Sequence, residues 1–131
     1  MAWKVETKEP VKQWQRSLDP VTAHRFEGTL ALLKERGPRL GRPFADTIKQ
    51  SRHHNMKELR VGNMRMLYAF DSRRTAVVLV AGDKTNDWKD WYRRNIPVAD
   101  RMFEQHQRGI RGGGRQWEAR TSATRPKESG R

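Results

Sequence analysis

The stretch from Met56 to Tyr92 constrains the fold more than any other part of the chain, because three strand-like runs follow one another there and lead into an aromatic-rich helix. The first run, Met56 to Arg60, is followed by Gly62-Asn63, a dipeptide that tolerates positive φ and therefore suits a tight reversal. We predict that the first two runs form a β-hairpin.

The second and third runs differ in how their apolar residues are spaced. The second run alternates, which predicts a strand with a different set of side chains on each face. The third run, Thr75 to Ala81, is almost wholly apolar and rich in valine, as is typical of a strand covered on both faces, and we expect it to be the innermost strand. The two faces of the second run are Met64, Met66, Tyr68 and Phe70 on one side, and Arg65, Leu67 and Ala69 on the other.

One strand and two helices are predicted before the hairpin. Alternation from Trp3 to Thr7 indicates a first strand, and Pro10 stands where the first turn of a helix tolerates proline. Asp19-Pro20 reads as an N-cap followed by proline at the first position of a second helix, which Gly37-Pro38 then ends.

The stretch from Arg39 to Asn55 carries two further turn signals, Gly41 and Pro43, but no sustained period. We therefore predict a loop. Phe44 and Ile48 are expected to be tucked under it.

Apolar residues recur at helical spacing from Trp88 to Phe103, which predicts a C-terminal helix lying on the sheet. Asn86 or Asp87 would cap its start, and Pro97 removes one backbone donor, so we expect a kink or a restart near Asn95. The whole order predicts an α+β fold: an N-terminal strand and two helices, a three-strand antiparallel meander, and a C-terminal helix packed on the sheet.

The chain is strongly basic, and the excess is not confined to one end. Lys and Arg number 28 against 15 Asp and Glu, a formal net charge of +13. Residues 108–131 hold seven Lys or Arg against two Glu, which leaves +5, so residues 1–107 carry +8. The charge of the predicted domain points to a polyanion such as nucleic acid, with an acidic partner protein as the alternative.

Residues 1–107 are predicted to form one compact domain, followed at 108–131 by a basic, disordered tail rich in Gly, Arg and Ser. The segment RGIRGGGR in this tail resembles arginine-glycine segments that hold RNA loosely, which makes Arg111 and Arg115 candidate RNA contacts. The absence of cysteine excludes a disulfide framework and a thiolate metal site. No apolar run approaches the ~20 residues of a membrane span, and the first residues lack a signal-peptide pattern, so we expect a cytoplasmic protein.

The order of these elements, together with several local motifs, resembles the RelE/ParE toxin superfamily, most closely its HigB-like, phage-derived branch. The resemblance covers residues 1 to 106 and is most specific in LGRPFADTIK, in HNMKELR, in MRMLYAFD, and in VAGDK-x3-W-x2-WY, with NIPVAD completing it. It implies a type II toxin that cleaves mRNA in the ribosomal A site, inhibits translation and is neutralised by a helix-turn-helix antitoxin from the neighbouring gene. Gyrase poisoning by ParE-type relatives is the alternative within this fold, and a non-catalytic basic RNA- or protein-binding module is the alternative of another class.

To cut RNA through its own 2′-hydroxyl, a protein must orient the nucleophile, stabilise a dianionic phosphorane and protonate the leaving 5′-oxygen. Arg65 matches the arginine that relatives direct at the scissile phosphate, and the alternative is an ion pair with Glu58 across the hairpin. Glu58 is predicted on the face that looks into the site, where some relatives place a glutamate as general base. Its alternative role is a cross-strand salt bridge in solvent.

Lys84, Tyr92 and His54 complete the candidate catalytic set. Lys84 corresponds to a basic residue that relatives use against the phosphate, unless it forms a plain ion pair with Asp83. Tyr92 resembles the C-terminal tyrosine that stacks on a base or shares in proton transfer, unless it belongs to the core. His54 stands near a point where some HigB-like relatives place a histidine, with a loop histidine in water as the alternative.

Further basic residues are candidate RNA contacts. Arg60 shares the inward face predicted for Glu58. Lys57 directly precedes Glu58, so its side chain should point to the opposite face unless the strand twists. The others are Arg73, Arg74 and Lys89.

A metal site built from Asp83, Asp87 and Asp90 is conceivable by spacing alone. Asp87 is better explained as a helix cap, and lysines intervene at positions 84 and 89. We therefore predict metal-independent cleavage and expect no cofactor.

Overall fold

The computed structural model describes residues 2–122, with side chains as far as Arg111. The class predicted from the sequence, α+β with the C-terminal helix on the sheet, is confirmed. Within the described residues the elements are β1 (Lys4–Thr7), α1 (Glu9–Arg16), α2 (Pro20–Arg36), the 3-10 helix η1 (Gly37–Arg39), β2 (Ala45–Thr47), β3 (Lys57–Val61), β4 (Met64–Phe70), β5 (Thr75–Asp83) and α3 (Trp88–Ser122).

The strands form one mixed sheet in the order β1-β5-β4-β3-β2. The predicted antiparallel meander is present as β3, β4 and β5, and β1 returns to pair in parallel with β5. This return places β4, rather than the valine-rich β5, in the middle of the sheet, so the prediction that β5 is innermost is wrong. An apolar run shows that both faces of a strand are covered, but it does not show how many strands lie on each side.

The segment predicted as a loop, Arg39 to Asn55, contains a short edge strand. In β2, Ala45 pairs with Leu59 and Thr47 with Lys57, in antiparallel register. Three residues are too few to show a period in the sequence, which is why the strand was missed. Ile48 is buried as expected, whereas Phe44 is 36% exposed, contrary to prediction.

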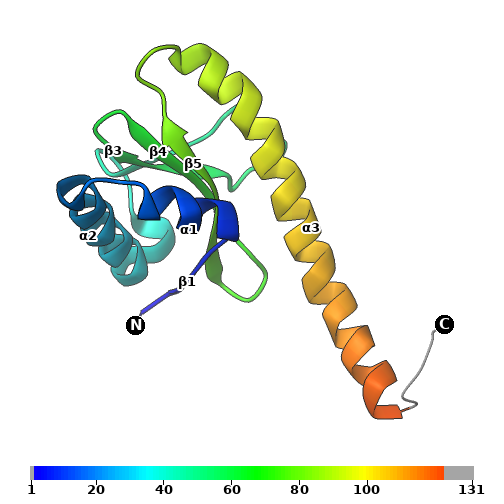
Figure 1. Cartoon of the computed structure of the whole chain (residues 1–131). Helices are drawn as coiled ribbons and strands as arrows, with labels where there is room; N and C mark the ends of the chain where they lie inside the picture. Colours follow the sequence, from blue (N-terminus) through cyan, green and yellow to red (C-terminus); the bar gives the residue numbers. More distant parts are fainter. Residues whose placement is uncertain (1, 123–131) are drawn as a thin grey trace.

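Two apolar cores lie on opposite faces of the sheet, one under each helical layer. Helices α1 and α2 cover one face and α3 covers the other (Figure 1). The alternation predicted for β4 is confirmed, because Met66 and Tyr68 pack under α1 and α2 while Leu67 and Ala69 pack under α3. The side chains of β4 that face α3 therefore include Arg65, which shares their parity.

Helix α3 begins where the sequence predicts and continues further than predicted. The carboxylate of Asp87 accepts a hydrogen bond from the backbone N–H of Asp90 at 3.2 Å, so Asp87 caps the helix. The helix is continuous through Pro97, so it does not restart near Asn95, and Ile96, Ala99 and Phe103 pack against the sheet on either side of the missing hydrogen bond. It extends to Ser122, past the predicted boundary at residue 107, so residues 108–122 of the segment predicted as a disordered tail are helical. The rest of that segment, 123–131, lies outside the described residues.

Two contacts fix α3 against the strands. A Cβ added at Gly82 would lie 2.5 Å from the indole nitrogen of Trp91, so this ring packs directly on the β5 backbone. At the other end, His106 Nε2 lies 2.8 Å from Asp71 Oδ2 in the turn after β4. Burial by itself raises the pKa of Asp71, but hydrogen bonds from His106 and from the backbone N–H groups of Thr75 and Arg73 hold it below its usual value.

No helix within residues 2–122 is both long and apolar enough to cross a bilayer.

Candidate active site

A hollow of about 440 Å³ opens between the hairpin end of the sheet and the first turns of α3. Four segments supply its walls: the end of β2 and the chain after it, the strands β3 and β4, the turn after β5, and α3. The lining residues are Thr47, Ile48, Lys49, Gln50, Glu58, Arg60, Arg65, Lys84, Trp88 and Tyr92.

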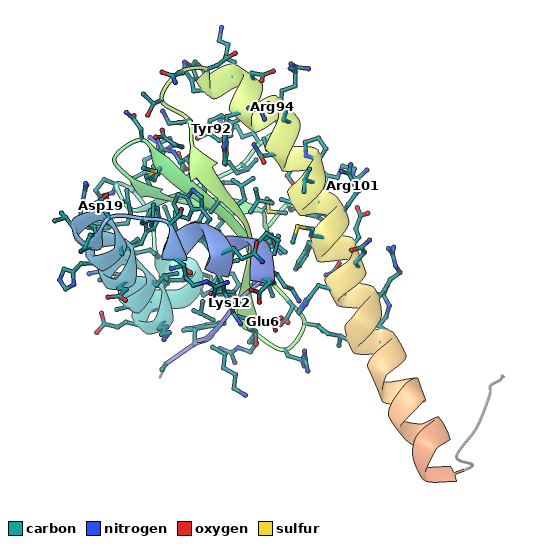
Figure 2. The ribbon with its side chains drawn as sticks, viewed as in Figure 1. Glu6, Lys12, Asp19, Tyr92, Arg94 and Arg101 are labelled. Atoms are coloured by element: carbon teal, nitrogen blue, oxygen red, sulfur yellow. The ribbon has the colours of Figure 1, made fainter. Side chains whose placement is uncertain are left out.

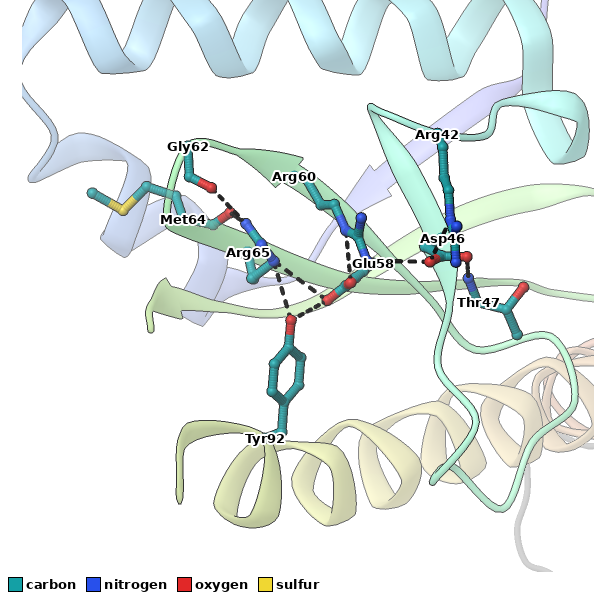
Figure 3. Close-up of polar contacts among 9 residues, drawn as sticks. All are labelled: Arg42, Asp46, Thr47, Glu58, Arg60, Gly62, Met64, Arg65 and Tyr92. Carbon is teal, nitrogen blue, oxygen red and sulfur yellow. Dashed lines mark hydrogen bonds and ion pairs between the residues drawn. The ribbon is translucent and has the colours of Figure 1, made fainter. Parts of the chain in front are cut away.

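At the bottom of this hollow, one carboxylate joins two arginines and a tyrosine (Figure 3). Glu58 Oε1 accepts a hydrogen bond of 2.5 Å from the hydroxyl of Tyr92 and lies 3.5 Å from Arg65 Nε. Its other oxygen accepts a hydrogen bond of 2.9 Å from Arg60 Nε. The ion pair foreseen between Arg65 and Glu58 is therefore present, but Glu58 is 3% exposed, so the pair is buried at the base of the hollow and not in solvent as expected.

Strand register explains why the sequence assembles this cluster. Arg60 and Arg65 are direct partners across the β3–β4 hairpin, and like charges directly opposite each other destabilise a sheet. Glu58, two residues before Arg60 and therefore on the same face, places its carboxylate between the two guanidinium groups. The charges in this cluster compensate one another, so removal of any one member leaves the remaining buried groups without a partner.

Arg65 is held on several sides. Its guanidinium Nη1 donates to the carbonyls of Gly62 at 2.7 Å and Met64 at 2.8 Å, and its Nε donates to Tyr92 Oη at 3.1 Å. Only 8% of the residue is exposed. A guanidinium fixed in this way is preorganised, and it would lose little further conformational entropy on meeting an anion.

Tyr92 reaches the cluster from the opposite side of the hollow. Figure 2 shows this side chain on the face of α3 that is turned to the sheet, whereas Arg101 projects from the other side of the helix. Burial raises the pKa of Tyr92 to about 12, and the hydrogen bond to the Glu58 carboxylate acts in the same direction, against a smaller opposing effect of Arg65. The phenol therefore keeps its proton at neutral pH and can donate it.

Lys84 is the fourth member that the structure brings to the hollow. Its backbone N–H donates to the carbonyl of Asn63 at 3.0 Å, which fixes the turn after β5 beside the β3–β4 hairpin. The expected alternative, an ion pair with Asp83, is absent, because the Asp83 carboxylate instead accepts hydrogen bonds from the backbone N–H and the hydroxyl of Thr85. Among the described residues Lys84 has no ion-pair partner.

His54 and Lys57 do not line the hollow. His54 is exposed in the loop before β3, because the chain turns its neighbour His53 inward to lie 3.1 Å from Glu104 of α3. Lys57 points to the other face of the sheet and donates to the carbonyl of Pro38 at 3.2 Å, as its parity in the sequence indicated.

The two arginines of the β4–β5 turn lie at the wrong end of the sheet for the hollow. Strand β4 separates them from Arg65 by roughly 20 Å, at about 3.4 Å per residue. Arg74, with a positive φ of 65°, places its guanidinium 4.5 Å from the centre of the Trp3 ring. Arg73 and Arg74 could therefore contact only a different part of a long RNA.

The remaining candidate contacts lie on α3. Lys89 stands one turn before Tyr92, on the rim of a neighbouring groove, with its ammonium group 5.6 Å from the centre of the Trp88 ring. Arg111 is exposed, and the side chain of Arg115 lies outside the described residues.

Sequence reasoning missed the contribution of the chain around β2. Lys49 and Gln50 line the hollow, and Asp46 accepts hydrogen bonds from Arg42 at 3.0 Å and Arg60 at 3.2 Å. The signal is in the sequence, since Arg42, Asp46 and Lys49 belong to the motif LGRPFADTIK that carries the family resemblance. Because this motif shows no period, the sequence does not indicate which of its side chains face the site.

The hollow is electropositive, with Lys49, Arg60, Arg65 and Lys84 against the single carboxylate of Glu58. This excess suits a phosphodiester and the additional charge of a phosphorane. The aspartates considered as metal ligands do not converge, since Asp90 is engaged by Arg93 and Arg94 and Asp87 caps α3.

Residues 13–104 match the family described as phage-derived Gp49-like protein. Two relatives come from Mycobacterium tuberculosis. HigB3, a candidate toxin by name, is 42% identical over 106 residues, which cover 79% of this chain and 93% of HigB3. HigB2, also named as a candidate toxin, is 40% identical over 111 residues, and this chain spans only 55% of its length.

Among solved structures, the archaeal RelE–RelB complex from Pyrococcus horikoshii OT3 has a chain that matches with a TM-score of 0.56 at 18% identity. The match covers 66% of this chain and 99% of that one. At this identity the likeness establishes the shared fold.

Proposed function

The chain belongs to the phage-derived Gp49-like family and has the fold of RelE, and from this premise we propose that it is the toxin of a type II toxin–antitoxin system, a ribosome-dependent endoribonuclease that cuts mRNA and stops translation. The observation that carries the proposal is the cluster of Arg65, Glu58 and Tyr92 at the base of an electropositive hollow. The names of the HigB relatives support the toxin assignment.

The cluster supplies the groups that cleavage by 2′-hydroxyl attack requires. Arg65 and Lys84 stabilise the extra negative charge that develops on the phosphorane. Glu58 accepts the proton of the attacking 2′-hydroxyl. Its carboxylate already accepts a hydrogen bond of 2.5 Å from the Tyr92 hydroxyl, so it is placed to accept one from another hydroxyl. Tyr92 is placed to protonate the leaving 5′-oxygen, since a phenol is a stronger acid than the alcohol that leaves.

The products follow from this chemistry. The upstream fragment carries a 2′,3′-cyclic phosphate, and the downstream fragment begins with a 5′-hydroxyl. The step is independent of metal ions in the sense that no water needs activation by a cation, because the substrate provides its own nucleophile.

A helix-turn-helix antitoxin from the neighbouring gene is the partner that this proposal requires, together with the ribosome and mRNA in the cytoplasm. The structural neighbour from Pyrococcus horikoshii is RelE in complex with RelB, which supports an antitoxin partner for this fold. The electropositive hollow, with four cations against one carboxylate, is a surface that an acidic antitoxin segment could also occupy.

One observation favours a second candidate, a non-catalytic basic binding module. Every charged group of the cluster is already paired inside the protein, so the cluster could serve only to join α3 to the hairpin. The two candidates differ in whether a covalent bond in RNA is broken.

Induced expression followed by primer extension on a cellular mRNA tests the proposal. The wild-type protein should create discrete 5′ ends within translated codons, and both Glu58→Gln and Arg65→Ala should remove them. Growth arrest without new 5′ ends would overturn the nuclease proposal and leave the binding module or gyrase inhibition. Equal cleavage by all three proteins would remove the cluster from the mechanism.

A further inference from the structure

A second hollow continues from the candidate active site along α3. Its volume is about 620 Å³, and it is lined by side chains of the loop after β2 and of the first three turns of the helix. Gln50, Trp88 and Tyr92 line both hollows, so the two are continuous. We call the second hollow the α3 groove, and its other lining residues are Arg52, Lys89, Arg93, Ile96, Pro97 and Asp100.

The α3 groove holds an exposed tryptophan that the cleavage chemistry does not use. Trp88 and Trp91 are three residues apart on α3, yet Trp88 is 52% exposed whereas Trp91 is 6% exposed and packs on β5. The ring of Trp88 meets that of Tyr92 edge to face, at 6.4 Å and 79°, and the Lys89 ammonium lies over the Trp88 ring at 5.6 Å, so a base would stack on the face of Trp88 away from Lys89 or displace this side chain. Trp88 opens the apolar repeat from which the sequence predicts a helix lying on the sheet, yet this large apolar side chain lies at the surface.

Positive charge surrounds the apolar floor of the groove. The floor is made by Trp88, Ile96 and Pro97, and the rim carries the cations Arg52, Lys89 and Arg93 with one carboxylate. Arg52 pairs with Glu104 at 2.9 Å and Arg93 pairs with Asp90, so Lys89 is the rim cation without an ion-pair partner among the described residues. The carboxylate, Asp100, is already engaged by the hydroxyl of Ser51 at 2.5 Å and the backbone N–H of Arg52 at 3.2 Å. The groove therefore offers an aromatic surface to a ligand that also bears negative charge, which is the chemistry of a single-stranded nucleotide.

We propose that the α3 groove binds the nucleobase next to the scissile phosphate, with Trp88 stacking on the base and the Gln50 amide contacting its edge. This inference rests on the proposed function and names the substrate subsite that the cleavage cluster leaves open. A base stacks on an aromatic ring whatever its identity, whereas an amide with one donor and one acceptor end discriminates between base edges. Trp88 thus supplies affinity, and Gln50 supplies preference.

Continuity with the phosphate-binding hollow argues for RNA over a protein segment. In a nucleotide, a single ribose joins the phosphate to the base. If the phosphate contacts Arg65 and Lys84, the base is therefore near Trp88 and Tyr92, which line both hollows. A helix of an antitoxin would bury its own apolar stripe in the groove and would not need the phosphate-binding hollow beside it.

Binding can be tested without cleavage. The probe is a single-stranded RNA trinucleotide made resistant by 2′-deoxy substitution, titrated into the ¹⁵N-labelled protein, with the indole N–H signal of Trp88 assigned by its absence in Trp88→Phe. The Trp88 signal should move while that of Trp14 stays, and an abasic residue at one of the three positions should abolish the movement. A Trp88 signal that ignores the RNA, or that moves equally with every abasic probe, would overturn the proposal.

Cleavage provides the second test. In a purified translation system, Trp88→Ala should lower cleavage roughly 10- to 100-fold, as expected for the loss of one stacked base, whereas Trp88→Phe should retain most of it. Gln50→Leu should instead flatten the preference among the four bases at the flanking position. The matched control is Val21→Ala, which truncates another exposed apolar side chain, on the opposite helical layer, and should change nothing.

The two tests separate this inference from the proposed function. Movement of the Trp88 signal with no cleavage by the wild type would support base binding in the α3 groove and overturn the nuclease proposal. Normal cleavage by Trp88→Ala would support the nuclease proposal and overturn base binding in the α3 groove. A Trp88 signal that responds to antitoxin and not to RNA would assign the groove to the partner protein instead.

Discussion

Replacing Tyr92 by Phe removes one hydroxyl from the centre of the cluster and tests whether the cluster contributes to stability as the geometry indicates. That hydroxyl donates to Glu58 at 2.5 Å and accepts from Arg65 at 3.1 Å, and both partners are charged. A hydrogen bond to a charged group contributes about 1.5–3 kcal/mol, so Tyr92→Phe should lower the free energy of unfolding at pH 7 by about that amount.

The raised pKa of Tyr92, caused first by burial, predicts how this stability difference changes with pH. A rise from the usual 10 to about 12 is two units, or about 2.7 kcal/mol at 1.36 kcal/mol per unit, and with partial exposure of the ring the stability difference should shrink by about 1–2 kcal/mol at high pH. The folded state holds the phenol proton more tightly than the unfolded state does. The contribution is therefore complete below pH 10 and is lost as the pH rises from 10 to about 12.

Urea unfolding of wild type and Tyr92→Phe at pH 7, 9 and 11 measures this effect. The difference between the two free energies of unfolding should be the same at pH 7 and 9 and smaller at pH 11. Comparing two proteins at each pH cancels the titration of the lysines, which both share.

The structure offers a matched control in Tyr68, whose hydroxyl is buried without a hydrogen-bond partner among the described residues. Tyr68→Phe also removes one phenol oxygen, but it should leave stability at pH 7 unchanged or increase it, because an unsatisfied buried hydroxyl is unfavourable. Equal losses in the two variants would refute the reasoning, as would a Tyr92→Phe protein as stable as wild type.

Three further predictions concern catalysis, the α3 anchor and the basic C-terminal segment. Arg65→Ala should slow cleavage by ~10² to 10³, as for the loss of one transition-state donor, while circular dichroism still reports the native fold. His106→Ala should lower the free energy of unfolding by about 2–3 kcal/mol at pH 7. The pKa of Asp71 is lowered in the folded state, so its stabilisation is present above pH ~4 and is lost below it, and His106→Ala should flatten this acid limb of the unfolding free energy. Deletion of residues 109–131 should leave the melting temperature unchanged and weaken ribosome association, by a factor that shrinks as salt rises in a binding titration. A melting temperature lowered by many degrees would show that this segment packs on the domain.

Periodic elements were predictable from the sequence because their geometry is written in residue spacing. The alternation of β4 placed Arg65 on the α3 side and Tyr68 on the other, and the parity of β3 placed Glu58 with Arg60 and set Lys57 apart. Side-chain faces follow from a period of two, and no tertiary information is needed.

The missed features depend on contacts that spacing does not encode. Strand β2 has three residues and is defined by its partner β3, and the middle position of β4 depends on the return of β1 to pair with β5. The exposure of Trp88 has a related cause, since helical spacing shows which side chains share a face of α3 but not which of them the strands cover.

The candidate site came partly from parity and partly from the family resemblance. Parity placed Arg65 and Glu58 together, whereas Lys84 and Tyr92 entered through motifs that spacing alone could not assign. The sequence could not show that His54 lies away from the hollow. A loop residue has no periodic constraint, and the direction of its side chain depends on which neighbour contacts α3.

The central proposal is that cleavage uses the 2′-hydroxyl of the RNA, and a single 2′-deoxy substitution at the scissile nucleotide of a translated message tests it most directly. In a purified ribosomal system the substituted message should remain intact, while the all-ribose message yields an upstream 2′,3′-cyclic phosphate and a downstream 5′-hydroxyl. Continued cleavage of the deoxy-substituted message at the same position would contradict the proposal, because the nucleophile would then have to be water.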